Sequence, residues 1–255
     1  MEANIYEYGQ QNFSLPHDIV QLPSGGVFYK SKKKAIKVGY LTANDENTLV
    51  NVVRNNNNSN IVMNLIRTKI YEHDLRAEEL TEGDVEAILL FLRNTSFGSD
   101  YTLSITDPSS KEKYDVTISL DEMNFKKTSV KPHEDGYFQV TLPKSNMSAK
   151  IRPLSYAETI ELDNMIEKYP KDRTAPIITW RLNKHIVELN GTTDKSQIAS
   201  IVDTLPIGDS KFIRNFLKEN TPSLDFKKEV TTPSGELVTV EVTFGVEFFR
   251  PFFQL

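Results

Sequence analysis

The sequence predicts an α+β fold made of two similar units from internal duplication, and three observations support this prediction. Residues 80–120 and residues 205–244 repeat one pattern: a Gly-Asp start, an amphipathic helical run, and two extended runs joined by a Pro-Ser turn. The matched residues lie 125 positions apart through the helix and the turn. Each copy also follows a stretch with its own extended and helical runs. Such self-similarity indicates repeated supersecondary units.

The matched residues have the same chemistry in both copies. Each copy has an aspartate after a glycine, apolar residues at helical spacing, and a proline between the extended runs. The pairs are Asp84 and Asp209, Ile88 and Ile213, Phe91 and Phe216, Leu92 and Leu217, and Pro108 and Pro233. Chance supplies apolar matches more easily than this ordered set, so the sequence predicts a duplication.

The composition is that of an ordinary soluble globular protein. The 255 residues suffice for one large domain or two small ones. A net charge of −5 argues against a dedicated nucleic-acid binder with a basic face. No apolar run is long enough to span a bilayer, and the N-terminal residues lack a signal-peptide pattern. Cysteine is absent, which excludes disulfides and cysteine-ligated zinc and fits a reducing cytosol.

The first unit is predicted to begin with a turn and a hairpin. Residues 1–21 are polar and aromatic with little periodicity, and we interpret them as an N-terminal arm. Residues 22–26 are a turn cluster. Residues 27–29 and 35–40 are predicted strands, and the lysine-rich tip between them, residues 30–34, either contacts phosphate or is solvated. We favour the solvated tip, because exposed lysines also discourage pairing at a sheet edge.

Helices are predicted next in the first unit. Thr42 and Asp45 have the spacing of a capping box, so a helix is predicted to start there. The asparagine-rich residues 54–60 are a predicted loop, since they contain no apolar residue to bury. Helical spacing resumes over residues 61–71, and the first copy of the repeat follows. We therefore place the first unit at residues 22–127.

The second unit is predicted to follow the same order. Residues 128–135 are a polar linker, and the unit covers residues 136–255. Its opening, Gly-Tyr-Phe at residues 136–138, resembles the Gly-Val-Phe of residues 26–28. Strands are predicted on both sides of a turn at residues 143–148. The predicted helices start at Ser155, with Glu158 completing a capping box, cover residues 177–189, and start at Asp194.

No residue pattern in the sequence predicts catalysis, a cofactor or a metal ion. The nucleophile elbow, the Walker loop and the dinucleotide-binding glycines are absent. The histidines lack metal-ligand spacing; they are His17, His73, His133 and His185. Asp84 and Asp209 either pair for acid–base catalysis or cap the helices that begin beside them, and we favour capping because both occupy the same frame of the repeat. We therefore expect a protein that is not an enzyme.

The two hairpin turns of the repeat lie where small zinc ribbons carry paired cysteines. Here residues 107–110 are Asp-Pro-Ser-Ser and residues 232–235 are Thr-Pro-Ser-Gly. Neither set can coordinate zinc tetrahedrally, so we expect a degenerate, metal-free ribbon. Strand pairing and core packing are expected to hold these hairpins.

The C-terminal tail is unusually aromatic, with five phenylalanines among residues 244–253. In one interpretation, Phe248 and Phe249 fill the core of the second unit. In the other, the residues after Pro251 anchor a protein partner, because aromatic side chains dominate binding energy at interfaces. Both hold if the tail divides at Pro251. The partner-binding candidates are Phe248, Phe249, Arg250, Pro251, Phe252, Phe253 and Leu255.

Four motifs together resemble one protein family. They are Leu-Pro-Ser-Gly-Gly at residues 22–26, Leu-Arg-Asn-Thr-Ser-Phe-Gly-Ser-Asp-Tyr at 92–101, Leu-Pro-Ile-Gly-Asp at 205–209, and Phe-Gly-Val-Glu-Phe-Phe-Arg-Pro at 244–251. Their order and spacing resemble those of the baseplate hub assembly proteins of T4-like contractile-tailed bacteriophages. Members of this family often carry Cys-Pro-x-Cys turns in the hairpins, and this chain departs from that pattern at both turns.

The resemblance implies a non-enzymatic protein that helps to assemble the central hub of the tail baseplate or forms a minor part of it. It implies hub or tape-measure proteins as partners, and a place in the host cell cytoplasm or the virion tail baseplate. We expect no nucleic acid, membrane or cofactor, and self-association stays open. One alternative is a hub-associated hydrolase with two carboxylates across a cleft. Another is a nucleic-acid binder that uses the lysines of residues 30–34 and 126–131.

Overall fold

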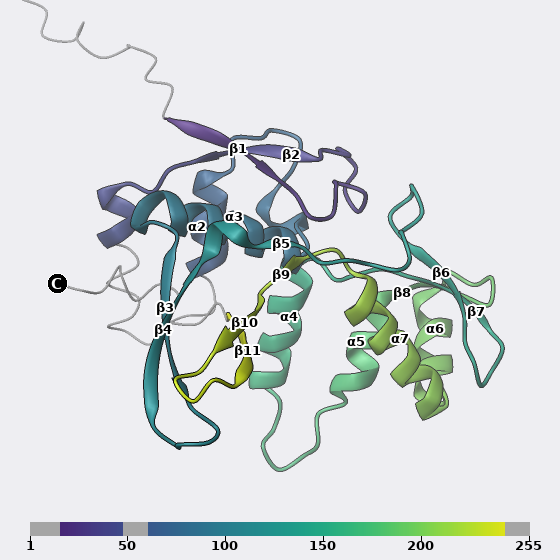
Figure 1. Ribbon diagram of the computed structural model, residues 1–255. Coiled ribbons are helices and arrows are strands. Elements are labelled where there is room, and N and C mark those ends of the chain that lie inside the picture. The colour runs from purple at the N-terminus through teal and green to yellow at the C-terminus, as the bar shows by residue number, and fades with distance from the viewer. Residues whose placement is uncertain (1–15, 48–60, 243–255) are drawn as a thin grey trace, which may run out of the picture.

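The computed structural model describes residues 16–47 and 61–242, in which helices pack against small antiparallel sheets (Figure 1). The predicted α+β fold class is confirmed. The described residues bury their apolar side chains in two separate clusters, here called the first core and the second core. No helix of these two ranges is both long and apolar enough to cross a bilayer.

The first core is formed by the N-terminal elements together with the last hairpin. Its fully buried side chains include Val38, Ile66, Leu80, Ile88 and Leu92. The elements up to residue 125 are β1 (His17–Gln21), β2 (Ala35–Gly39), α2 (Ile61–Lys69), η1 (Ala77–Glu79), α3 (Glu82–Phe97), β3 (Asp100–Thr106), β4 (Lys113–Ser119), η2 (Leu120–Glu122) and β5 (Asn124–Phe125). The helix and hairpin predicted for the first copy of the repeat are thus confirmed as α3 and β3–β4.

The first hairpin differs from the prediction, because β2 pairs with β1. The predicted strand at residues 27–29 is wrong, since residues 23–28 run through turns. Gly26 has a positive φ there, and a Cβ atom would lie 2.1 Å from the carbonyl oxygen of Lys33, so the turn requires glycine. The strand β1 comes from the end of the segment that we interpreted as an arm, residues 1–21. The proposed match with residues 136–138 therefore compares a turn with the start of a strand.

The second core is formed by a three-stranded sheet and the helices beside it. The strand order is β6-β7-β8, with both pairs antiparallel. The elements are β6 (Phe138–Thr141), β7 (Ser148–Ile151), α4 (Tyr156–Glu167), α5 (Ile177–His185), β8 (Ile186–Leu189), α6 (Lys195–Asp203) and α7 (Ile207–Asn220). The predicted helix starts are confirmed, because Ser155 and Glu158 form a capping box and Asp194 accepts the N–H of Gln197 at 2.8 Å.

The predicted helix over residues 177–189 is wrong at its end, because α5 stops at His185 and β8 follows. In β8, Ile186 and Leu189 are fully buried and pair with β7. The edge of β7 offers hydrogen bonds that a longer helix would leave unmade. This tertiary contact outweighs the helical spacing of the apolar residues.

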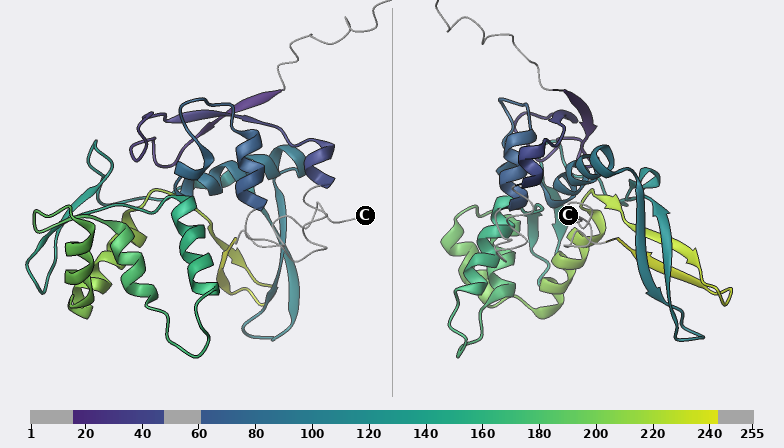
Figure 2. Two further views of the ribbon diagram at one scale, coloured as in Figure 1. Left: turned by 180° about the vertical axis from the view of Figure 1, so that it is seen from behind. Right: turned by 90° about the vertical axis from the view of Figure 1, so that its left-hand side faces the viewer.

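The last described elements form a hairpin that returns to the first core. They are β9 (Leu224–Asp225), β10 (Lys227–Thr231) and β11 (Leu237–Glu241). β9 pairs with β5, and the β10–β11 hairpin lies beside β3–β4 (Figure 2). Its buried side chains, such as Phe226, Val230 and Val240, belong to the first core. The division into units at residues 22–127 and 136–255 stays a prediction, as does the duplication.

Candidate functional site

The carboxylate of Asp84 is fully buried in the first turn of α3 and binds a turn from another element. Its donors are the N–H of Ser24 at 2.9 Å, the hydroxyl of Ser24 at 2.5 Å, and the hydroxyl of Tyr29. Burial raises the pKa of Asp84, and these hydrogen bonds lower it. Burial and the nearby carboxylate raise the pKa of Tyr29 well above its usual value, so the phenol keeps its proton. We call these three residues the Asp84 clasp.

Asp209 has the same place in the first turn of α7 and is also fully buried. It accepts the N–H groups of Lys144 at 2.7 Å and of Ser145 at 2.9 Å, in the turn between β6 and β7. We call these three residues the Asp209 clasp. The prediction that Asp84 and Asp209 cap their own helices is wrong, because neither helix has a side-chain cap hydrogen bond. Both carboxylates hold preceding turns and still lie near a positive helix end.

The two clasps bear directly on the hydrolase alternative. Acid–base hydrolysis of this kind needs two carboxylates that flank a substrate. Asp84 and Asp209 each have 0% of their surface exposed, and each is bound to a turn of a different hairpin. This pair is therefore not arranged as a catalytic acid and base.

The two hairpin turns meet through the buried carboxylate of Asp107. Asp107 accepts the N–H of Ser109 at 2.8 Å and of Ser110 at 3.1 Å within its own turn. It also accepts the N–H of Ser234 at 3.2 Å and its hydroxyl at 2.7 Å, from the β10–β11 turn. The bond from Ser234, followed by those from its own turn, lowers the pKa of Asp107 to about 2. We call this contact the hairpin bridge; it adds a polar link to the predicted strand pairing and packing.

Several lysines of the nucleic-acid alternative already have partners inside the protein. Lys33 makes ion pairs with Glu72 and Asp74. Lys32 donates to two backbone carbonyl oxygens. Lys126 donates to two carbonyl oxygens at the end of α7, at 2.5 and 3.3 Å. These contacts occupy cations that a phosphate backbone would have to recruit.

The described histidines lie in different surroundings. His17 packs edge-on against an aromatic ring, and His133 stacks on another. The Nδ1 atom of His185 lies 2.8 Å from the carbonyl oxygen of Arg152, and burial lowers the pKa of His185. Within residues 16–47 and 61–242, no group of three or more His, Asp or Glu side chains could hold a metal ion. The expectation of no metal site stays an expectation for the whole chain.

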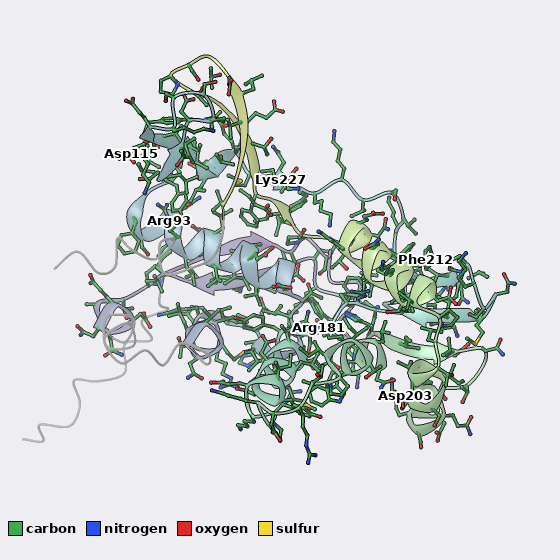
Figure 3. The ribbon with its side chains drawn as sticks, turned by 90° about the horizontal axis from the view of Figure 1, so that it is seen from below. Arg93, Asp115, Arg181, Asp203, Phe212 and Lys227 are labelled. Carbon is green, nitrogen blue, oxygen red and sulfur yellow. The ribbon has the colours of Figure 1, made fainter. Side chains whose placement is uncertain are left out.

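A cleft of about 1120 Å³ lies between the two cores and is the candidate interaction site. Its lining comes from α3, α4, α5 and α7 and from the segments around β5 and β9. Glu82 and Glu86 bring carboxylates from α3, while Arg181 and Arg214 bring cations from α5 and α7. Figure 3 labels Arg181 and also Lys227, which lines the cleft from β10. The apolar lining includes Leu154, Leu162, Leu217, Leu224 and Phe226.

Glu86 is a half-buried carboxylate of this cleft. Burial raises the pKa of Glu86 to about 8; the neighbouring Glu82 also raises it, and Lys126 lowers it. Among the described residues, neither Glu82 nor Glu86 has an ion-pair partner. The cleft therefore keeps an unpaired acid in a place where water is restricted.

The sequence analysis did not identify Glu86 or the cleft. One local signal was present, because Glu82 and Glu86 are one helical turn apart and so share a face of α3. The opposing cations, Arg181 and Arg214, come from helices far along the chain, and no local pattern places them near α3. The tail candidates lie outside the described residues; they are Phe248, Phe249, Arg250, Pro251, Phe252, Phe253 and Leu255.

Comparison with known proteins gives one match. A family model described as T4 bacteriophage base plate protein matches residues 22–250. No curated protein and no solved structure matches the chain. The matched range begins at the turn that the Asp84 clasp holds and includes the cleft, the second core and all of the first core except Val20.

Proposed function

The chain belongs to the T4 bacteriophage base plate protein family, and from this premise we propose that it is a non-enzymatic protein of the central hub of the tail baseplate. It acts either as an assembly factor or as a minor subunit. The observation that carries the proposal is the family match over residues 22–250, which spans both cores. As a T4-type baseplate protein, it is a component of the virion tail or of its assembly. Its position in the central hub of the baseplate is the part that we propose.

The internal chemistry supports a role in binding protein. The buried carboxylates Asp84, Asp107 and Asp209 are all bound to donors that hold turns or hairpins together. The cleft, in contrast, offers apolar side chains and charged groups of both signs. Such a mixture suits a protein surface better than a small uniform substrate. The partners that we propose are other hub proteins or the tape-measure protein, met in the cytoplasm of the infected host.

The test is to capture a tagged chain from infected cells in mid-assembly, identify the proteins captured with it, and examine purified virions for the chain. Hub or tape-measure proteins in the capture and no chain in virions would identify an assembly factor. The chain in both would identify a hub subunit. Capture of neither hub nor tape-measure proteins would contradict the proposal and reopen the hydrolase alternative.

A second arm tests the tail candidates on the same proteins. Deleting residues 251–255 removes the proposed aromatic anchor, including Phe252, Phe253 and Leu255. We expect weaker capture of the hub partner by at least about tenfold, since a buried aromatic hot spot contributes about 2 kcal/mol or more. Lys211→Gln, at an exposed residue of α7 that is neither a tail candidate nor part of the cleft lining, is the control and should leave capture unchanged. Unchanged capture after the deletion would exclude the tail from the interface.

A further inference from the structure

The cleft between the two cores contains two carboxyl groups that form no ion pair with any described residue. Glu86 lies one turn after Glu82 on α3, and both line the cleft. The charge of Lys126 lowers the pKa of Glu86. Its ammonium group already donates to the carbonyl oxygens of Lys218 and Thr221. The described part of the chain thus leaves the Glu82–Glu86 pair available to a cation from outside.

An unpaired carboxylate in a half-buried place is costly to keep ionised. The raised pKa of Glu86 expresses this cost, because the acid holds its proton near neutral pH until a cation approaches. Hydrogen bonds between an ammonium or guanidinium group and a carboxylate are stronger than neutral ones. A lysine or arginine that enters the cleft would therefore gain the most binding free energy from a hydrogen-bonded ion pair with Glu86.

The rest of the cleft limits what can carry that cation. A free metal ion would find two carboxylates but no third acidic or histidine ligand in the described residues. A nucleic-acid backbone would bring phosphates against Glu82 and Glu86. The other cations of the lining would repel a wholly basic segment and attract an acidic group; they are Lys127, Arg181, Arg214, Lys218 and Lys227. Of these, Arg181 already pairs with Asp163 at 3.6 Å. A protein segment that carries both charges, together with apolar side chains, matches all three kinds of lining.

The size of the cleft agrees with such a segment. Its volume of about 1120 Å³ exceeds the range of about 300–1,000 Å³ typical of small-molecule sites. We propose that this cleft docks an extended segment of a partner protein of the hub, with a lysine or arginine of that segment bound by Glu86 and Glu82. This inference rests on the proposed function, because it supplies the surface with which the chain meets its partner.

The test combines two measurements on the full chain and the hub complex captured with it. A photo-cross-linking amino acid at Asn215, an exposed cleft residue of α7, reports what enters the cleft. The same group at Glu167, exposed on α4 and outside the cleft lining, is the control. We expect a cross-link from position 215 to a hub-protein peptide that contains lysine or arginine, and none of this kind from position 167.

The second measurement is the affinity of the purified, cross-link-identified hub protein for two matched variants. Glu86→Gln keeps the shape and the neutral form of the side chain but cannot ionise, so binding should weaken at least about tenfold. Glu167→Gln should leave the affinity unchanged. Glu86→Gln removes a half-buried acid and should fold at least as stably as the wild type, which chemical unfolding of the variant checks.

Four results would overturn the inference. Capture of the hub protein with no cross-link from position 215 would leave the proposed function intact and exclude the cleft. A cross-link from position 215 to this chain's own peptides, including residues 243–255, would assign the cleft to the chain itself. Equal affinities of wild type and Glu86→Gln would exclude the Glu86 contact. If no hub or tape-measure protein is captured at all, the proposed function and the inference both fail.

Discussion

Asp84 and Asp209 occupy the same place in the first turn of α3 and of α7, and both are fully buried, yet different donors hold them. Asp84 takes two of its three hydrogen bonds from the hydroxyl groups of Ser24 and Tyr29. Asp209 takes both of its bonds from consecutive backbone N–H groups in the β6–β7 turn. One clasp depends on particular side chains, and the other depends on the path of the backbone.

This difference determines how each clasp responds to change. A hydroxyl group can donate or accept a hydrogen bond, whereas a backbone N–H group can only donate. The Asp84 clasp can therefore rearrange around a neutral partner, while the Asp209 clasp requires an acceptor at two fixed places. The same contact between turn and helix is thus compatible with turns of unrelated sequence, Pro-Ser-Gly-Gly in one and Pro-Lys-Ser-Asn in the other.

The largest effect is expected when the carboxylates are removed. Asp84→Ala leaves the buried N–H and hydroxyl of Ser24 without an acceptor, and the Tyr29 hydroxyl keeps only Thr81 Oγ1 at 3.3 Å. It should lower the free energy of unfolding by about 3–5 kcal/mol. Asp209→Ala leaves two backbone N–H donors in a turn that is only partly buried, so its cost should be about 2–3 kcal/mol. Urea unfolding followed by far-UV circular dichroism measures both. An equal or larger loss in Asp209→Ala would show that the burial of the donors does not set the difference between the clasps.

The order should reverse when each aspartate is replaced by asparagine. Asp209→Asn turns an NH₂ group toward one of two backbone N–H donors and should cost about 1–3 kcal/mol. Asp84→Asn should cost less than about 1 kcal/mol, because the hydroxyl groups of Ser24 and Tyr29 can rotate to accept from the new NH₂ group. Urea unfolding of both asparagine variants measures the two losses of stability. If Asp84→Asn is the more damaging change, ionisation of Asp84 matters more than the flexibility of its donors.

The clasps also show what the sequence could and could not predict about the fold. The Gly-Asp starts, the helix of each repeat copy and the Pro-Ser turns are local signals, and they correctly predicted α3, α7 and the two hairpins. The partners of Asp84 and Asp209 come from turns some 60 residues earlier in the chain. Within the local sequence, the only structural role available to those carboxylates was to cap the adjacent helix. We therefore predicted capping, and this prediction is wrong.

The comparison of α3 with α7 extends to the residues that follow the aspartates. Two positions after Asp84 is Glu86, which lines the cleft, and two positions after Asp209 is the exposed Lys211. The folded pKa of Glu86 is about 8, above the usual value of about 4.3 in an unfolded chain. The folded state therefore holds this proton longer than the unfolded state, and the contribution to stability falls as pH rises from about 4 to 8.

Glu86→Gln should remove that loss and raise the free energy of unfolding at pH 8 by about 1–2 kcal/mol. The shift from about 4.3 to about 8 would correspond to at most about 5 kcal/mol, at about 1.4 kcal/mol per pKa unit, and the side chain is only partly buried. At pH 4 the variant and the wild type should be equally stable. Lys211→Gln is the control on α7 and should change little at either pH. Chemical unfolding at pH 4, 6 and 8 measures the slopes; parallel slopes for wild type and Glu86→Gln would mean that Glu86 titrates as an exposed acid does.

The candidate site was harder to predict than the fold, for a physical reason that Glu86 illustrates. Its position on one face of α3 follows from helical spacing, but its surroundings include β9, which meets α3 only in three dimensions. Function was predicted in the aromatic tail, because a cluster of aromatic residues stands out in the composition of the chain. An unpaired charge cannot be recognised in a sequence, because long-range packing decides whether a charged side chain has a partner.

The smallest effect on global stability is expected at the hairpin bridge, where the two matched turns differ again. Asp107 provides the acceptor, and Thr232 holds the matched place in the other turn. The folded pKa of Asp107 is about 2, below the usual value of about 3.9. Its contribution to stability is therefore present above about pH 4 and is lost as pH falls toward 2.

Amide hydrogen exchange, corrected for intrinsic rates, should show this loss locally at the N–H groups of Ser109 and Ser234, which donate to Asp107. Their protection should fall between pH 4 and 2 in the wild type. In Asp107→Asn it should be low throughout, because an amide accepts more weakly than a carboxylate and the charge is gone. Asp115→Asn, on the exposed part of β4, should behave as wild type. If protection at Ser234 persists in Asp107→Asn, strand packing alone keeps the two turns together, and the hairpins need no bridge at their tips.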